Sequence, residues 1–192
     1  GEPWRTTSAA VVRRLAIAEG DPVDPDALAA AVDAEEPRLA RERAFASLAR
    51  AETSVARLRD KLCDDGYPAD VVEPVIAEAV GAGYVDDERY ARILARDLAE
   101  THRYGRSRVA AGLASRGIPP DIVARVLEDA CPPVDEHSRA AATASRLAAG
   151  AHGSVRRLAE RLVRKGFAPS IAWAAARAAT GADSCDIPDA LQ

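Results

Sequence analysis

The chain has 192 residues, of which 48% are hydrophobic and only 4% aromatic, and its formal net charge at pH 7 is −4. This length supports a hydrophobic core without a disulfide or a metal to stabilise it, and the abundant alanine favours closely packed helices. The net negative charge argues against a uniformly basic protein that coats nucleic acid without selectivity.

Cysteine usage argues against a disulfide framework. Cys63, Cys131 and Cys185 are odd in number, widely spaced and not arranged in CxxC pairs, so we expect reduced thiols, no metal site and no cofactor. There is no long apolar run and no signal-peptide pattern, so we expect a cytoplasmic protein without a membrane segment. We also expect a monomer. Because the chain begins with Gly1 and contains no methionine, we expect native residues to precede it.

Residues 1–38 differ in pattern from the rest and are predicted to form an N-terminal segment. The stretch 2–7 is typical of the end of a strand, and 9–18 of a short helix. A turn at 19–22 precedes a second helix, predicted over 25–32 and capped by Asp24.

One sequence pattern occurs three times, at 54–67, 105–118 and 154–167. Its glycines, Gly66, Gly117 and Gly166, are 51 and 49 residues apart. A fixed period of this length is typical of repeat proteins. We therefore predict an all-α protein of three tandem three-helix repeats that form an elongated, curved body. The predicted repeats are 39–83, 84–132 and 133–181, and a polar tail follows at 182–192.

The middle helix of each repeat carries two apolar residues four positions apart, which line one face. These pairs are Leu58 and Leu62, Val109 and Leu113, and Leu158 and Leu162. The glycine that follows each helix is expected to adopt the left-handed conformation that ends it. In the third repeat, Phe167, Ile171 and Trp173 are expected to line the apolar face.

The string 83–91, Gly-Tyr-Val-Asp-Asp-Glu-Arg-Tyr-Ala, joins the first two repeats. Asp86 and Asp87 form either a helix cap or part of a metal site. A cap is the better interpretation, because adjacent carboxylates at a helix start commonly cap it and no third ligand is evident. Tyr84 is expected to pack at the junction, and Tyr90 in the groove between repeats.

These motifs resemble the RecX family of regulatory proteins, which modulate the RecA recombinase. The string 83–91 resembles the family's junction GYLDDERFA, and 54–67 its helix S-x-x-E-L-x-x-K-L-x-x-K-G-F. The stretch 104–118 is similar to its helix G-x-x-R-L-x-x-E-L-x-x-K-G-I, and 164–167 to its final repeat. The resemblance spans about residues 11–175. Arg57 departs from it, because the family commonly has an acid there, and Gly112 replaces a residue better suited to a helix.

The resemblance implies a curved chain of three-helix repeats that binds the RecA–DNA filament and inhibits its ATPase and strand exchange. It implies a role in DNA repair, recombination and the SOS response, and no catalysis by the protein itself. The implied partners are the RecA filament and single-stranded DNA within it, with weak binding to DNA alone.

Basic residues gather on the repeated helices. The stretch 101–117 contains four arginines and no acid, and 155–165 contains five basic residues against Glu160. The predicted filament- or DNA-binding residues are Arg103, Arg106, Arg108, Arg116, Arg157, Arg161, Arg164 and Lys165. For each one alone, an ordinary solvated helix face is the simpler interpretation. The predicted structural motif residues are Gly66, Tyr84, Asp86, Asp87, Tyr90, Gly117 and Gly166.

Two other functions remain open. The chain could be a helical module that binds nucleic acid without sequence preference and without RecA, or an adaptor for an unrelated protein whose arginines only confer solubility. The sequence contains no GxGxxG, P-loop or GxSxG motif, so nothing in it points to an enzyme.

Overall fold

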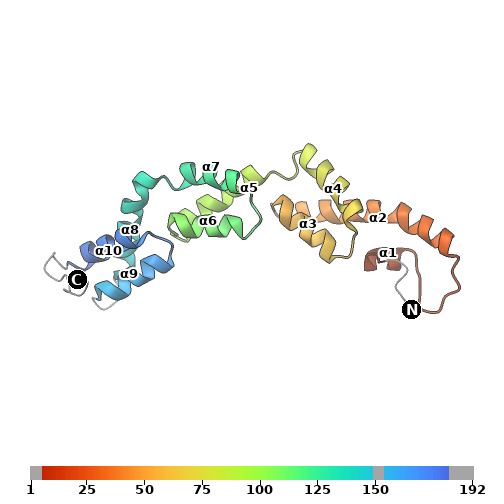
Figure 1. Cartoon of the computed structure of the whole chain (residues 1–192), viewed down its shortest axis with the longest axis horizontal. Coiled ribbons are helices and arrows are strands. Elements are labelled where there is room, and N and C mark those ends of the chain that lie inside the picture. Colours follow the sequence, from red (N-terminus) through yellow and green to blue (C-terminus); the bar gives the residue numbers. More distant parts are fainter. Residues whose placement is uncertain (1–5, 149–153, 182–192) are drawn as a thin grey trace, which may run out of the picture. The chain divides into compact units, whose positions relative to one another are not determined.

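The computed structural model describes residues 6–148 and 154–181, and every regular element in these ranges is helical (Figure 1). The all-α prediction is confirmed for this part of the chain. It divides into two compact units, Gly1–Tyr90 (the N-terminal unit) and Ala91–Gln192 (the C-terminal unit). Most of the strand expected at 2–7, and the whole polar tail, lie outside the described residues. Thr6 and Thr7 are described and are not in a strand.

The N-terminal unit contains α1 (Ala9–Arg14), α2 (Pro25–Leu48), α3 (Val55–Asp64) and α4 (Ala69–Gly81). Helix α1 is shorter than predicted, and Ala16 just beyond its end has a φ of 52°. A non-glycine residue rarely adopts this left-handed conformation, which cannot continue a right-handed helix. Buried Leu58, Leu62, Tyr67, Val72 and Ile76 form part of the unit's core.

Helix α2 differs from the prediction, because one continuous helix covers both the helix predicted over 25–32 and the beginning of the repeat predicted to start at residue 39. Pro37 lies inside it and lacks the N–H for a helical hydrogen bond. The buried side chains of α2 recur every four positions across this point: Val32, Glu36, Ala40 and Ala44. Glu36 is fully buried and accepts a hydrogen bond from Thr7 Oγ1. Packing of this stripe outweighs the lost hydrogen bond, and the boundary predicted at residue 38 falls inside α2.

The two adjacent aspartates at the junction bond to backbone N–H groups of two different helices. Asp86 Oδ1 accepts from the N–H groups of Glu88 and Arg89, both at 2.9 Å, at the start of α5 (Asp87–Arg96). Asp87 Oδ1 instead accepts from the N–H of Val55 at 2.8 Å, at the start of α3. The first contact is the predicted cap, whereas the second joins helices that are distant in the sequence.

Helix α5 spans the division between the units. The C-terminal unit continues with the π-helical turn η1 (Asp97–Thr101), α6 (Arg106–Ala114), α7 (Pro120–Ala130) and the 3-10 turn η2 (Pro133–Asp135). It ends with α8 (Glu136–Ala148), α9 (Val155–Arg164) and α10 (Pro169–Thr180). Helix α10 packs against both α8 and α9 (Figure 1).

The core around α8, α9 and α10 consists largely of alanine, with Leu158, Leu162 and Phe167 as its large buried side chains. Small residues let these helices approach closely. Trp173 differs from the prediction, because 39% of its surface is exposed. Ala172 and Ala176, which lie four positions apart on α10, face the core around α8, α9 and α10 instead.

The three repeat glycines all adopt the left-handed conformation, as predicted. Their φ angles are 91° for Gly66, 72° for Gly117 and 90° for Gly166. Each follows the middle helix of its repeat and ends it.

Candidate functional site

Charge is divided unevenly between the two units. The N-terminal unit has 11 basic and 19 acidic residues, a net charge of −8, and the C-terminal unit has 15 basic and 11 acidic residues, a net charge of +4. All eight predicted contact residues belong to the C-terminal unit. An anionic partner is therefore attracted to that unit and repelled by the other.

Two of the predicted residues, Arg108 and Lys165, meet around Tyr104. The Arg108 guanidinium lies 4.5 Å from the centre of the Tyr104 ring, and Lys165 Nζ lies 5.0 Å from it. The imidazole of His102 stacks on the same ring, with 5.4 Å between ring centres. We call His102, Tyr104, Arg108 and Lys165 the Tyr104 cluster.

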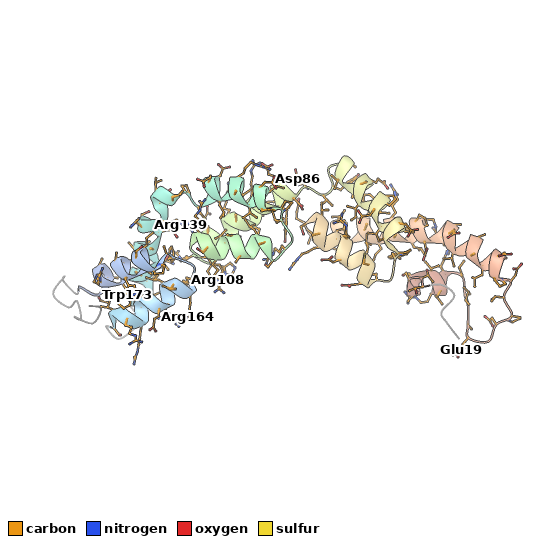
Figure 2. All side chains as sticks on the ribbon, in the orientation of Figure 1. Glu19, Asp86, Arg108, Arg139, Arg164 and Trp173 are labelled. Atoms are coloured by element: carbon orange, nitrogen blue, oxygen red, sulfur yellow. The ribbon has the colours of Figure 1, made fainter. Side chains whose placement is uncertain are left out.

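Hydrogen bonds to backbone carbonyls hold both cations in place. Arg108 Nη1 donates to the carbonyl of Arg164 at 2.8 Å, and Lys165 Nζ donates to the carbonyl of His102 at 2.9 Å. Figure 2 shows Arg108 on α6 and Arg164 on α9, the two helices that meet here. The cluster is therefore built by tertiary contact between the second and third repeats.

That contact depends on two glycines. The N–H of Gly105 donates to the carbonyl of Lys165 at 2.8 Å, and the N–H of Ser107 to the carbonyl of Gly166 at 3.3 Å. A Cβ on Gly105 would lie 2.3 Å from the Gly166 oxygen, and one on Gly166 would lie 2.4 Å from Arg108 Cβ. Only residues without a side chain permit this approach of one backbone to the other.

One carboxylate lies beside the Tyr104 cluster, since Asp97 Oδ2 is 3.6 Å from His102 Nε2. Among the described residues, no carboxylate forms an ion pair with Arg108 or Lys165. Their partners are neutral carbonyls and the face of an aromatic ring, and an exposed cation–π contact contributes only about 0.5–1 kcal/mol. Cations that are not paired with a carboxylate are chemically suited to contact a phosphate or a carboxylate from outside the chain.

Arg106, another of the predicted contact residues, forms hydrogen bonds within the C-terminal unit. Its Nη1 donates to the carbonyls of Leu127 at 2.8 Å and Cys131 at 2.7 Å, and its Nη2 bonds to Glu128. It thereby adds a second hydrogen bond to the Leu127 carbonyl, which also accepts from the Cys131 N–H at 3.0 Å, and bonds to the Cys131 carbonyl just beyond the end of α7. Arg116 Nη1 similarly donates to the carbonyl of Gly112 at 2.8 Å.

Helix α9 presents its basic residues as predicted. Leu158 and Leu162 are fully buried, whereas Arg157 and Arg164 are exposed and Arg161 is partly exposed. In the described ranges, these three guanidinium groups form no ion pair. The fourth arginine of α9, Arg156, was not among the predicted residues, and its Nε lies 3.0 Å from Glu160 Oε1.

Sequence reasoning missed His102, Tyr104 and Arg139. Tyr104 directly precedes Gly105 in the repeated pattern, which marked its position but not its role. Arg139 Nη2 donates to the Tyr104 carbonyl at 2.6 Å from α8, a contact with no signal in the sequence. Arg103, between η1 and α6, has a φ of 54°, which is uncommon for a residue with a side chain.

Two glutamates in ion pairs on the protein surface have lowered pKa values. Hydrogen bonding from Arg59 lowers the pKa of Glu73, and hydrogen bonding from Arg41 lowers that of Glu78. Both pairs belong to the N-terminal unit. Solvent screens such exposed pairs, so each contributes little to stability.

Other kinds of site have little support. Cys63 and Cys131 are free thiols, exposed and buried respectively, and Cys185 lies outside the described residues. Within 6–148 and 154–181, no group of three or more His, Cys, Asp or Glu side chains is placed to hold a metal ion. In the same ranges, no helix is both long enough and apolar enough to cross a bilayer.

Comparison with known proteins finds relatives that match most of this chain. Residues 40–78 match the family model of the first three-helix domain of RecX, and residues 86–127 match that of its second three-helix domain. The chain is 34% identical over 143 residues to "Regulatory protein RecX" of Halorhodospira halophila, covering 72% of this chain and 87% of the relative. It is 29% identical over 132 residues to the protein of that name from Caldanaerobacter subterraneus, covering 69% of this chain and 66% of the relative.

A solved structure supports the fold independently. The crystal structure of a regulatory protein RecX superposes with a TM-score of 0.66 at 22% identity, covering 86% of this chain and 83% of that one.

Proposed function

Because the chain belongs to the RecX family of regulatory proteins, we propose that it inhibits the RecA recombinase by binding the RecA–DNA filament. Bound there, it opposes the subunit rearrangements that ATP hydrolysis and strand exchange require. It acts by binding, and catalyses no reaction itself. Contacts from several repeats to several filament subunits add through effective concentration.

The observation that carries this proposal is the Tyr104 cluster in a unit of net charge +4. Arg108 and Lys165 are fixed in position and lack carboxylate partners among the described residues. Such a pair suits the phosphates of DNA within the filament. Arg157 and Arg161 on α9 add positive charge to the same unit.

Salt dependence distinguishes a filament regulator from a plain nucleic-acid-binding module. Binding through phosphates alone weakens with salt, with a log–log slope of about −0.7 for each phosphate contacted on single-stranded DNA. The chain carries an overall charge of −4, so it should bind bare single-stranded DNA weakly and the RecA filament well. Tight, steeply salt-dependent binding to bare DNA would instead favour the module.

The test measures co-sedimentation with RecA filaments formed on single-stranded DNA with a non-hydrolysable ATP analogue. The double variant Arg108→Gln, Lys165→Gln keeps hydrogen-bond donors but loses both charges, and should bind about tenfold more weakly, a change of about 1.4 kcal/mol. The matched control Arg13→Gln, Arg50→Gln removes the same charge from exposed positions of the N-terminal unit. Equal weakening by both double variants would show that only net charge matters.

A further inference from the structure

The C-terminal unit contains a second feature that the Tyr104 cluster does not use. A pocket of about 280 Å³ is lined by residues from η1, α7, α8 and the turn before α10. Its apolar wall includes Ala142 and the buried ring of Phe167, and its charged groups are Arg103, Arg139 and Glu100. Two guanidinium groups against one carboxylate leave the pocket with net positive charge.

Arg139, one of the residues that line this pocket, has one guanidinium nitrogen without a hydrogen-bond partner among the described residues. Its Nη2 donates to the Tyr104 carbonyl at 2.6 Å, but its Nη1 is buried and has no hydrogen-bond partner within the described residues. A buried donor on a charged group is costly to leave unpaired, more so than a neutral one. Native proteins rarely leave such a group without an acceptor unless a ligand or water supplies one.

The second guanidinium group of the pocket, that of Arg103, is not paired with the pocket's carboxylate. In the described part of the chain, Glu100 forms no ion pair with Arg103 or Arg139. Arg103 also holds a left-handed backbone conformation, with a φ of 54°. Strained residues of this kind concentrate at binding sites, where surrounding contacts maintain them.

We propose that this pocket receives the carboxylate of an aspartate or glutamate side chain from a partner protein. The planar carboxylate accepts hydrogen bonds from Arg139 and Arg103, and its methylene groups pack against Ala142 and Phe167. A phosphodiester fits less well, because its charged oxygens would meet the apolar wall. Only the identity of the partner rests on the proposed function: the carboxylate then belongs to an acidic residue of a filament subunit.

The pocket can be filled without removing any polar group. Ala142 is exposed on α8 and lines the pocket, so Ala142→Leu should block it while preserving the helix. Ala141 is exposed on the same helix and does not line the pocket, so Ala141→Leu is the matched control. Arg103→Gln provides a second variant that removes one of the two guanidinium groups.

The first arm tests the pocket without RecA. Sodium acetate, and separately sodium phosphate, is titrated at constant ionic strength while NMR follows the side-chain N–H signals of Arg139. Acetate should shift these signals in the wild type and in Ala141→Leu, but not in Ala142→Leu, and Arg103→Gln should weaken the response. Absence of an acetate response in the wild type, or tighter binding of phosphate than of acetate, would overturn the proposal.

The second arm measures co-sedimentation with the RecA filament. Ala142→Leu should bind about tenfold more weakly than Ala141→Leu, with binding to bare single-stranded DNA unchanged in both. Equal filament binding by the two variants would overturn the acidic contact while leaving the proposed function standing. If the wild type does not bind the filament, the proposed function fails, and the acetate arm decides separately whether the pocket binds carboxylates.

Discussion

The contact between Gly105 and Gly166 offers a direct test of how the second and third repeats pack. Gly105 has φ −72° and ψ 165°, which alanine adopts without strain, so Gly105→Ala changes only the space that the residue occupies. The new methyl group would lie 2.3 Å from the Gly166 oxygen and 2.5 Å from the Phe167 nitrogen. Both atoms belong to backbone, so neither can move aside as a flexible side chain would.

The expected cost follows from these contacts. Overpacking a tightly packed site costs about 1–3 kcal/mol. Moving α6 away would also weaken the Gly105–Lys165 and Ser107–Gly166 hydrogen bonds, which contribute about 0.5–1.5 kcal/mol each. The free energy of unfolding should therefore fall by about 2–6 kcal/mol, which for the C-terminal unit, of about 100 residues, lowers the melting temperature by roughly 8 °C or more.

Thermal unfolding followed by circular dichroism measures this change. The control is Gly81→Ala, because Gly81 ends α4 and a Cβ there would meet nothing within 4 Å. That variant should be as stable as the wild type or slightly more stable, since alanine favours helix. If Gly105→Ala melted within about 2 °C of the wild type, a loss of about 0.5 kcal/mol or less, the close backbone contact would be refuted.

Three further predictions concern side chains. Arg106→Gln should destabilise the protein by about 1–3 kcal/mol, because it removes the hydrogen bonds from Arg106 to the carbonyls of Leu127 and Cys131. Equal unfolding midpoints in denaturant for the variant and the wild type would contradict this structural role. Arg157→Glu combined with Arg161→Glu should weaken inhibition of RecA without loss of helicity, and wild-type inhibition would remove α9 from the proposal. The hydrogen bond from Arg59 lowers the pKa of Glu73 below the usual glutamate value of 4.5. This ion pair therefore stabilises the fold fully above pH 4.5, and its contribution is lost as the pH falls through the lower pKa of the folded state. Glu73→Gln should therefore reduce the loss of stability on acidification, and unchanged acid unfolding curves would contradict the assignment.

Features determined by local sequence could be predicted well. Helix ends depend on nearby residues, so the left-handed glycines and the cap at Asp86 followed from the sequence alone. The continuation of α2 through Pro37 did not, because a buried stripe that packs on other helices outweighs the local preference of proline. The prediction that Trp173 lines the apolar face was wrong for a related reason. Small alanines of α10, and not its largest side chain, face the core around α8, α9 and α10.

The site was only partly predictable. The basic stretches drew attention to Arg108 and Lys165 as candidates, but their meeting at Tyr104 depends on a backbone contact between two repeats. The same dependence on tertiary structure explains why Arg106, two positions from Arg108, bonds to the end of α7. Charge along the sequence indicates which helices are basic, but not which guanidinium groups remain available.

The most direct test of the central claim is the rate of ATP hydrolysis by RecA on single-stranded DNA, measured with increasing amounts of this protein. We expect the rate to fall with the wild type, and to fall much less with Arg108→Gln, Lys165→Gln at the same concentration. An unchanged rate with the wild type, at concentrations where the folded protein is in excess over RecA, would contradict inhibition of the filament.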